Sequence, residues 1–187
     1  SEDCLFVNVW RPAVKSNTKR PVMFWIHGGA FETGTIFTQA YDGRYLAHRG
    51  DLIVVSVNYR LGAFGFLTGG SVPGNLGLHD QILALKWTHE NIDKFGGDPE
   101  QITIFGESAG AISVGALVLS PLTKGLFKRA ILQSGAQSGY FTSESRGHSM
   151  QKTLNLAQKL KCSIAKSSID IDDQTIECLK SKPVEEI

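Results

Sequence analysis

The chain has 187 residues, enough for one domain with a sizeable buried core. Hydrophobic residues make up 42% of it, a content typical of globular proteins and not of disordered ones. The net charge is +1 and there is no basic block, so we expect neither nucleic acid nor an anionic membrane as the main partner.

The first half of the chain alternates between strand and helix patterns. We expect strands over residues 5–10, 21–26 and 51–59. Residues 51–59 are apolar nearly throughout and rich in β-branched side chains, as in a strand buried on both faces. Residues 77–95 place apolar side chains at helical spacing, and the glycine pair 96–97 ends that helix.

The second half continues the alternation. We expect strands at 102–105 and 129–133, helices at 109–119 and 150–160, and an irregular loop at 133–151. Strands that alternate with helices predict an α/β fold, with a mostly parallel central sheet flanked by helices. The chain is interpreted as one such unit, and an incomplete one.

One serine stands between two glycines where a strand is expected to give way to a helix. The sequence GESAG, residues 106–110, fits the pattern G-x-S-x-G in the required context. A strained turn needs glycines where side chains would collide with the neighbouring strand and helix. The start of a helix also favours developing negative charge. Ser108 is therefore the candidate nucleophile.

A second glycine-rich segment follows another expected strand. The sequence HGGAF, residues 27–31, lies after the apolar run 21–26, where an oxyanion loop is expected. Small residues let backbone N–H groups approach a ligand, and one such donor is worth about 3–4 kcal/mol of transition-state stabilisation. A plain glycine turn is the alternative. Both motifs in this order, each after a strand, favour the oxyanion loop.

Over nearly its whole length the sequence resembles the type-B carboxylesterase and cholinesterase family of α/β hydrolases. Its first residues, SEDCL, followed by NVW, are similar to the family signature E-D-C-L-x-L-N. Longer matches are VNYRLGAFGFL at 57–67, GNLGLHDQ at 74–81, ENIDKFGGDP at 90–99 and FGESAGAISV at 105–114. The resemblance implies an α/β-hydrolase fold, with residues 1–187 forming a single partial domain truncated at both ends.

The resemblance also implies roles in catalysis. Ser108 matches the nucleophile, while Gly29, Ala30 and Ala109 match the three N–H donors of the oxyanion hole. Ala30 replaces the third glycine of the family loop, a departure that keeps its N–H group.

Further residues match the surroundings of the family's site. Arg60 and Asp80 correspond to a buried ion pair that we interpret as structural. Glu107 is either an elbow carboxylate or a group that tunes the nucleophile. Tyr140 and Phe141 lie near the family's acyl pocket, although the match there is loose, so the acyl preference stays open.

Three cysteines are present without C-x-x-C spacing, which argues against a zinc or redox motif, and we expect no metal or cofactor. The resemblance implies a disulfide between Cys162 and Cys178 that closes about 15 residues and stabilises by roughly 3 kcal/mol. It also implies a partner for Cys4 upstream of Ser1. A disulfide indicates an oxidising compartment, so we expect a secreted protein or one of the endoplasmic reticulum lumen.

A serine nucleophile needs a histidine as general base and an acid to orient it, in the chain order Ser, acid, His. After Ser108 the sequence offers His148, with Glu144 between them. We interpret His148 as a loop residue and expect the catalytic acid and histidine beyond Ile187. His27, which precedes the oxyanion glycines, is interpreted as a positioning residue and not as a base.

These patterns together predict a serine carboxylic ester hydrolase that acts on small-molecule esters through an acyl-enzyme, with the 187 residues alone inactive. A cholinesterase-like adhesion protein that binds partners without hydrolysis is the alternative. A missing histidine downstream would favour it. Esterase or lipase, the natural substrate and membrane association are left open.

Overall fold

The computed structural model describes residues 2–14, 16–138, 143–163, 167 and 171–187. Its centre is a five-stranded sheet with strand order β1-β3-β2-β4-β5. The strands are β1 (Val7–Trp10), β2 (Arg20–Ile26), β3 (Ile53–Val57), β4 (Gly97–Glu107) and β5 (Arg129–Gln133). All neighbouring pairs are parallel except β1, which runs antiparallel to β3. The expected mostly parallel sheet is confirmed.

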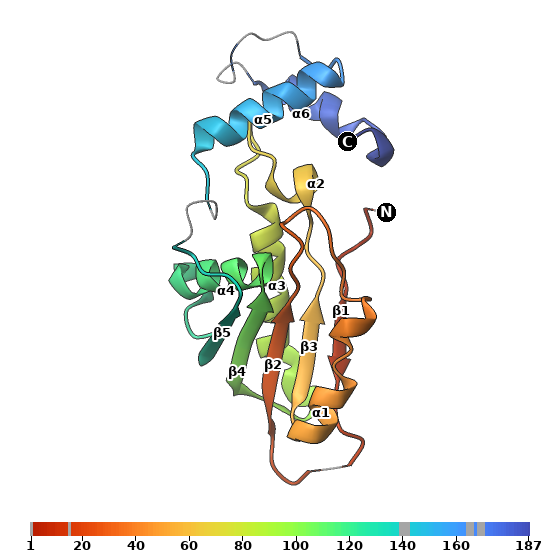
Figure 1. The fold of residues 1–187 in the computed structure, drawn as a ribbon, viewed down its shortest axis with the longest axis vertical. Helices are drawn as coiled ribbons and strands as arrows, with labels where there is room; N and C mark the ends of the chain where they lie inside the picture. Colours follow the sequence, from red (N-terminus) through yellow and green to blue (C-terminus); the bar gives the residue numbers. More distant parts are fainter. Residues whose placement is uncertain (1, 15, 139–142, 164–166, 168–170) are drawn as a thin grey trace.

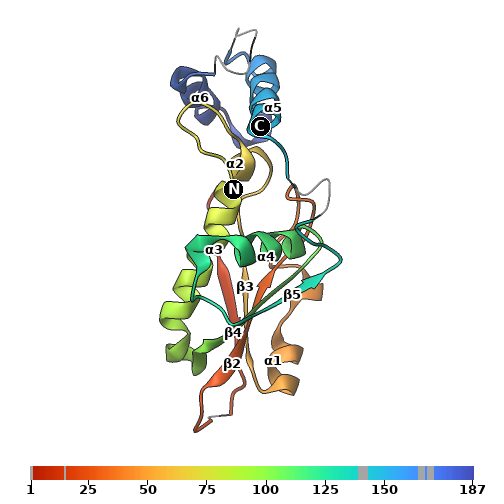
Figure 2. The ribbon, with the colours of Figure 1, turned by 90° about the vertical axis from the view of Figure 1, so that its left-hand side faces the viewer.

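The helices are α1 (Arg44–Gly50), α2 (Gly62–Phe66), α3 (Leu76–Asn91), α4 (Ala109–Leu119), α5 (Arg146–Lys159) and α6 (Asp173–Lys180). Short 3₁₀ turns occur at Gln39–Tyr41, Ile92–Phe95, Pro121–Thr123 and Val184–Glu186. Figure 2 shows α1 on one side of the sheet and α3 on the other. In the described part of the chain, no helix combines the length and the apolar composition that a membrane crossing requires.

The main core lies between the sheet and the helices α3 and α4. Successive side chains of a strand point to opposite faces, so every second residue faces the same side. Val22, Phe24 and Ile26 of β2 follow this spacing, belong to this core and are fully buried. Leu85 of α3 and Val114 of α4 pack into the same cluster. β3 is buried at all five positions, as its continuous apolar sequence predicts for a central strand of a covered sheet.

The helices α5 and α6 form a separate small unit beyond the carboxyl ends of the parallel strands (Figure 1). They share their own core, which consists of Leu154, Ala157, Ile171, Ile176 and Leu179. The expected disulfide between Cys162 and Cys178 is present and joins the end of α5 to α6. Thr153 of α5 donates its hydroxyl to the carbonyl of Thr68 at 2.8 Å, which ties this unit to the segment after α2.

Several bounds differ from those expected. β4 begins at Gly97 and not at 102, because Gly97 still pairs with Arg20 of β2 although the segment 98–101 is mostly polar. The segment 133–151 was expected to be an irregular loop, but α5 begins within it at Arg146. The Ser145 hydroxyl accepts a hydrogen bond from the His148 N–H at 3.3 Å and caps the helix. His148 therefore lies in the first turn of α5, and the prediction of a loop position was wrong.

Candidate active site

Ser108 lies at the sharp turn between β4 and α4, in a backbone conformation that is uncommon for any residue other than glycine. Its φ is 54° and its ψ is −120°. Such conformations cost about 1–3 kcal/mol and persist only where the surroundings hold them. Here the Ser108 N–H donates to the Gln133 carbonyl at 2.9 Å, and the Ser108 carbonyl accepts from Ile112 N–H at 3.0 Å. The backbone on both sides of the serine is thus fixed by its neighbours.

The two glycines of the motif are required by close backbone contacts. A Cβ on Gly110 would lie 2.1 Å from the carbonyl oxygen of Ile26, at the end of β2. A Cβ on Gly106 would lie 2.5 Å from the carbonyl carbon of Gly110. Neither contact can be relieved by moving a flexible side chain, so the turn accepts only glycine at both positions.

The segment 27–31 lies directly beside this turn. It follows β2, and Ile26 pairs with Gly106 on the adjacent parallel strand β4, so both motifs emerge at the same edge of the sheet. A Cβ on Gly28 would lie 3.2 Å from the Ser108 Cβ and 2.7 Å from the Glu107 carbonyl oxygen. The structure therefore places the serine and the glycine loop next to each other, although they are far apart in the sequence.

The glycine loop has an unusual backbone. Gly29, Ala30 and Phe31 have φ values of 114°, 56° and 63°. For residues with a side chain, a left-handed conformation costs roughly 1–2 kcal/mol. The turn is closed by the Gly29 carbonyl, which accepts from the N–H groups of Glu32 at 3.0 Å and Thr33 at 2.9 Å.

The N–H groups of the three expected oxyanion donors have no hydrogen-bond acceptor among the described residues. Among the hydrogen bonds of the described residues, none uses the N–H of Gly29 or Ala30. Ala109 is the first residue of α4, where an N–H has no partner within the helix. These groups are available to an external acceptor, and the start of α4 adds a favourable dipole for negative charge.

His27 is fully buried at the base of the glycine loop. Its ring stacks on Tyr59 with the centroids 4.5 Å apart, and the Tyr59 hydroxyl donates to the His27 carbonyl at 2.9 Å. The His27 Nδ1 lies 2.8 Å from the Gly28 carbonyl oxygen, whereas its Nε2 has no partner among the described residues. Burial lowers the pKa of His27 and raises the pKa of Tyr59, so both rings are neutral at pH 7.

The other candidate residues lie in different settings. Glu107 is half-buried, and its Oε2 lies 2.9 Å from the position that a Cβ on Gly28 would take, so this carboxylate contacts the glycine loop. Tyr140 and Phe141 lie outside the described residues. Their placement near an acyl pocket stays a prediction.

Arg60 and Asp80 form a two-pronged ion pair. Arg60 donates from Nε and from Nη2 to the two Asp80 carboxylate oxygens, each at 2.8 Å, and its backbone N–H adds a bond of 3.0 Å. The hydrogen bond to Asp80 raises the pKa of Arg60. The pair ties the segment after β3 to α3, which fits a structural role.

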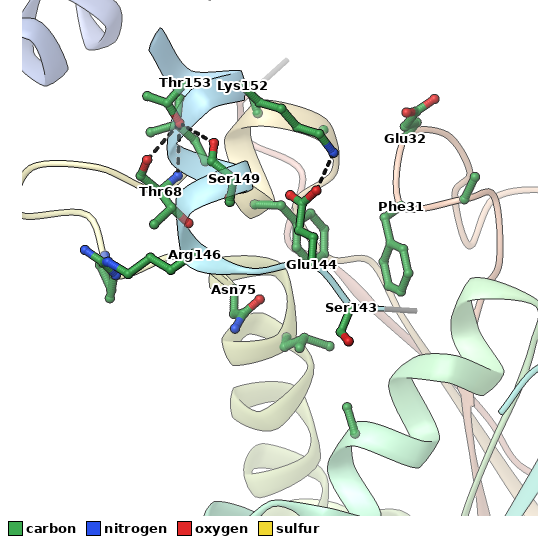
Figure 3. A pocket seen from close by; sticks show the side chains of 18 of the residues that line it. Phe31, Glu32, Thr68, Asn75, Ser143, Glu144, Arg146, Ser149, Lys152 and Thr153 are labelled. Atoms are coloured by element: carbon green, nitrogen blue, oxygen red, sulfur yellow. Dashed lines mark hydrogen bonds and ion pairs between the residues drawn. The ribbon is translucent and has the colours of Figure 1, made fainter. Parts of the chain in front are cut away.

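A cavity of about 820 Å³ opens beside the glycine loop, between α2, α3, α4 and α5. Figure 3 shows Phe31 of the loop facing the same space as Glu144 and Lys152, which form an ion pair of 2.6 Å. Ala30 also lines this cavity, but Ser108 is not among the described residues that do. The space adjoins the glycine loop.

The described residues place no histidine against Ser108 by a hydrogen bond. His148 has a largely exposed side chain, and its Nδ1 lies 3.6 Å from Oε2 of Glu144, which precedes α5. No three His, Cys, Asp or Glu side chains of the described residues gather in a way that could hold a metal ion.

One contact near the serine was missed from the sequence. A Cβ on Gly135 would lie 2.6 Å from the Ser108 carbonyl oxygen, so this glycine lets the chain after β5 close against the turn. Its only signal was a glycine two residues after an expected strand, and a glycine at such a position has many other causes.

A serine at a strand-to-helix turn, with a glycine loop on the adjacent parallel strand, is the arrangement of α/β hydrolases. The Carboxylesterase family model matches residues 1–187, and the chain belongs to that family. It is 47% identical to an acetylcholinesterase of Danio rerio and 46% identical to one of Electrophorus electricus, each over the whole chain. The chain spans 29% of the length of these two relatives.

Proposed function

We propose that the complete protein carrying this chain is a serine carboxylic ester hydrolase that acts through an acyl-enzyme. The close approach of Gly28 to Ser108 supports this most directly, because it sets the glycine loop beside the serine. The family membership and the acetylcholinesterase relatives support the same class of reaction.

In this proposal the Ser108 hydroxyl attacks the ester carbonyl. The N–H groups of Gly29, Ala30 and Ala109 stabilise the negative charge that develops on the carbonyl oxygen. A histidine from the rest of the protein takes the serine proton and passes it to the leaving alcohol. Water then attacks the acyl-enzyme, with the same histidine as base, and releases the carboxylic acid.

The substrates are small carboxylic esters, with Glu107, Tyr140 and Phe141 as candidates for the surroundings of the acyl group. The Cys162–Cys178 disulfide supports an oxidising compartment, either outside the cell or in the endoplasmic reticulum lumen.

Steady-state hydrolysis of a chromogenic acetate ester by the complete protein tests the proposal. We expect Ser108→Ala to lower kcat by at least about a thousandfold, because the oxyanion donors alone leave only residual catalysis. Ser16→Ala, in the exposed segment before β2, serves as the control and should keep full activity. Equal rates for the wild type and Ser108→Ala would instead favour a protein that binds partners without hydrolysis.

A further inference from the structure

The direction of each oxyanion donor is set by the carbonyl on the opposite side of its peptide group. A trans peptide is planar, and its C=O and N–H point in opposite directions. The described residues contain no cis peptide bond. A hydrogen bond that holds the carbonyl of Gly28 therefore also fixes the direction of the Gly29 N–H.

The three donor peptides are anchored to different degrees. The Ser108 carbonyl, in the peptide of Ala109 N–H, accepts a helical bond from Ile112 N–H. The Gly29 carbonyl, in the peptide of Ala30 N–H, accepts from two backbone N–H groups and from the Thr33 hydroxyl at 3.3 Å. Both anchors rest mainly on backbone groups, which no substitution of a side chain removes.

The Gly28 carbonyl is the exception. Among the described residues its one hydrogen-bond partner is His27 Nδ1, at 2.8 Å. Because a carbonyl oxygen only accepts, Nδ1 must carry the ring proton. A Cβ on Gly34 would lie 2.6 Å from both of these atoms, so the Gly34 backbone packs closely over the bond and leaves little room for water.

The ring itself is held in place for this contact. It stacks on Tyr59, whose hydroxyl donates a hydrogen bond to the His27 carbonyl. With Nε2 buried and unpartnered, the ring makes no polar contact among the described residues except the one to Gly28.

We infer that His27 is a positioning residue of the oxyanion hole: its neutral Nδ1–H holds the Gly28 carbonyl and so aims the Gly29 N–H at the substrate oxygen. This inference rests on the proposed ester hydrolysis. It gives His27 a function through Gly29, without contact to the substrate and without proton transfer.

A matched pair of variants in the complete protein isolates this hydrogen bond. Asn and Leu have nearly the same shape, and both remove the ring and its stacking on Tyr59. The Asn amide can donate from about the position of Nδ1, while Leu cannot donate at all. The measurements are kcat and KM for an acetate ester, the affinity for a trifluoromethyl ketone that forms a tetrahedral adduct with the serine, and the thermal unfolding midpoint.

We expect His27→Leu to have a kcat about tenfold to a hundredfold below that of His27→Asn, since complete loss of one donor costs about 10²–10³. The KM values of the two variants should be similar, and the ketone affinity should fall by the same factor as kcat/KM. Equal kcat and ketone affinity in the two variants, with an active wild type, would overturn the inference.

A spectroscopic test does not depend on activity or on the folding of the variants. The ¹⁵N chemical shifts of His27 in the wild-type protein should show the proton on Nδ1, and a proton on Nε2 would overturn the inference. A wild type without any turnover would contradict the proposed function itself, and with it the catalytic role of His27.

Discussion

Ala30 occupies a backbone conformation that glycine adopts at lower cost. Its φ of 56° lies in the left-handed region, and the neighbouring Phe31 has a φ of 63°. Strained residues of this kind persist where the surrounding structure fixes them, often in functional loops. In the proposed function, the alanine thus keeps its donor N–H in place at the expense of local stability.

Exchanging alanine and glycine in this loop should have opposite effects at neighbouring positions. We expect Ala30→Gly to change the free energy of unfolding by no more than about 1 kcal/mol, on the stabilising side, because relief of strain outweighs the entropy cost of glycine. We expect Gly29→Ala to destabilise by about 3 kcal/mol or more, because its Cβ would lie 2.1 Å from the Thr33 carbonyl oxygen. Denaturant unfolding of the complete protein measures both, and equal effects would contradict the strain described for Ala30.

The buried His27 should also make stability depend on pH. Its folded pKa lies below the ordinary value of 6.5, because burial disfavours the charged ring, and the Tyr59 ring that faces it is neutral. The unfolded chain therefore binds the proton more tightly than the folded one. This difference in pKa stabilises the folded state. The stabilisation is complete above pH 6.5 and is lost progressively as the pH falls from 6.5 through the lower pKa of His27 in the folded protein.

The difference in unfolding free energy between the wild type and His27→Asn isolates this effect, since all other titrating groups are shared. We expect the wild type to lose stability relative to the variant as the pH falls below 6.5. A difference that stays constant with pH would show that His27 is not held neutral by burial.

Among the elements, those with strong local signals were predicted with their correct bounds. Helix α4 and strand β5 lie where the sequence placed them, because an apolar run after the GESAG turn and a short β-rich segment each favour one structure. Helices α1, α2 and α6 were missed. They are short, and isolated helices of that length are marginal, so their stability comes from tertiary packing that the sequence does not display.

The α5–α6 unit should depend on its disulfide more than the sheet does. The disulfide joins residues 16 positions apart. The core of the unit is small, since it consists of five buried apolar residues. Replacing both Cys162 and Cys178 by Ser should lower the stability of this unit by roughly 3 kcal/mol through loss of loop closure. Hydrogen exchange should then quicken in α6 and stay slow in β2 and β3.

Ser16→Ala, in the exposed segment before β2, offers a control for this measurement, because it leaves the Cys162–Cys178 disulfide intact. Faster exchange throughout the sheet in the Cys162/Cys178 variant, or no change in α6, would show that α5 and α6 are not a separately stabilised unit.

At the scale of the whole molecule, the residues of the candidate site lie together at the carboxyl-terminal edge of the sheet. The carboxyl ends of β2 and β4 present the glycine loop and Ser108 side by side, with the 820 Å³ cavity next to the loop. The sequence predicted both motifs because each has a fixed pattern after a strand. It could not predict the close approach of Gly28 to Ser108, or that Nε2 of His27 is buried without a hydrogen-bond partner among the described residues, because these arise only when distant segments pack together.

The molecule also leaves apolar surface open on β5 and at the far end of α4 from Ser108. Strand β5 exposes Ile131 and Leu132, and the end of α4 exposes Val118 and Leu119. The chain covers 29% of the length of its acetylcholinesterase relatives. We therefore expect the acid and histidine that complete the site to come from the rest of the protein, and the isolated 187 residues to hydrolyse esters poorly.

The most direct test of the central claim is covalent labelling of the complete protein with a fluorophosphonate ester, followed by mass spectrometry of its peptides. This reagent phosphonylates a serine that is activated by a base and an oxyanion hole. The account predicts one adduct on the peptide that contains Ser108, lost in Ser108→Ala and slowed in His27→Leu. An unlabelled Ser108 in a folded, complete protein would contradict the assignment of this serine as the nucleophile.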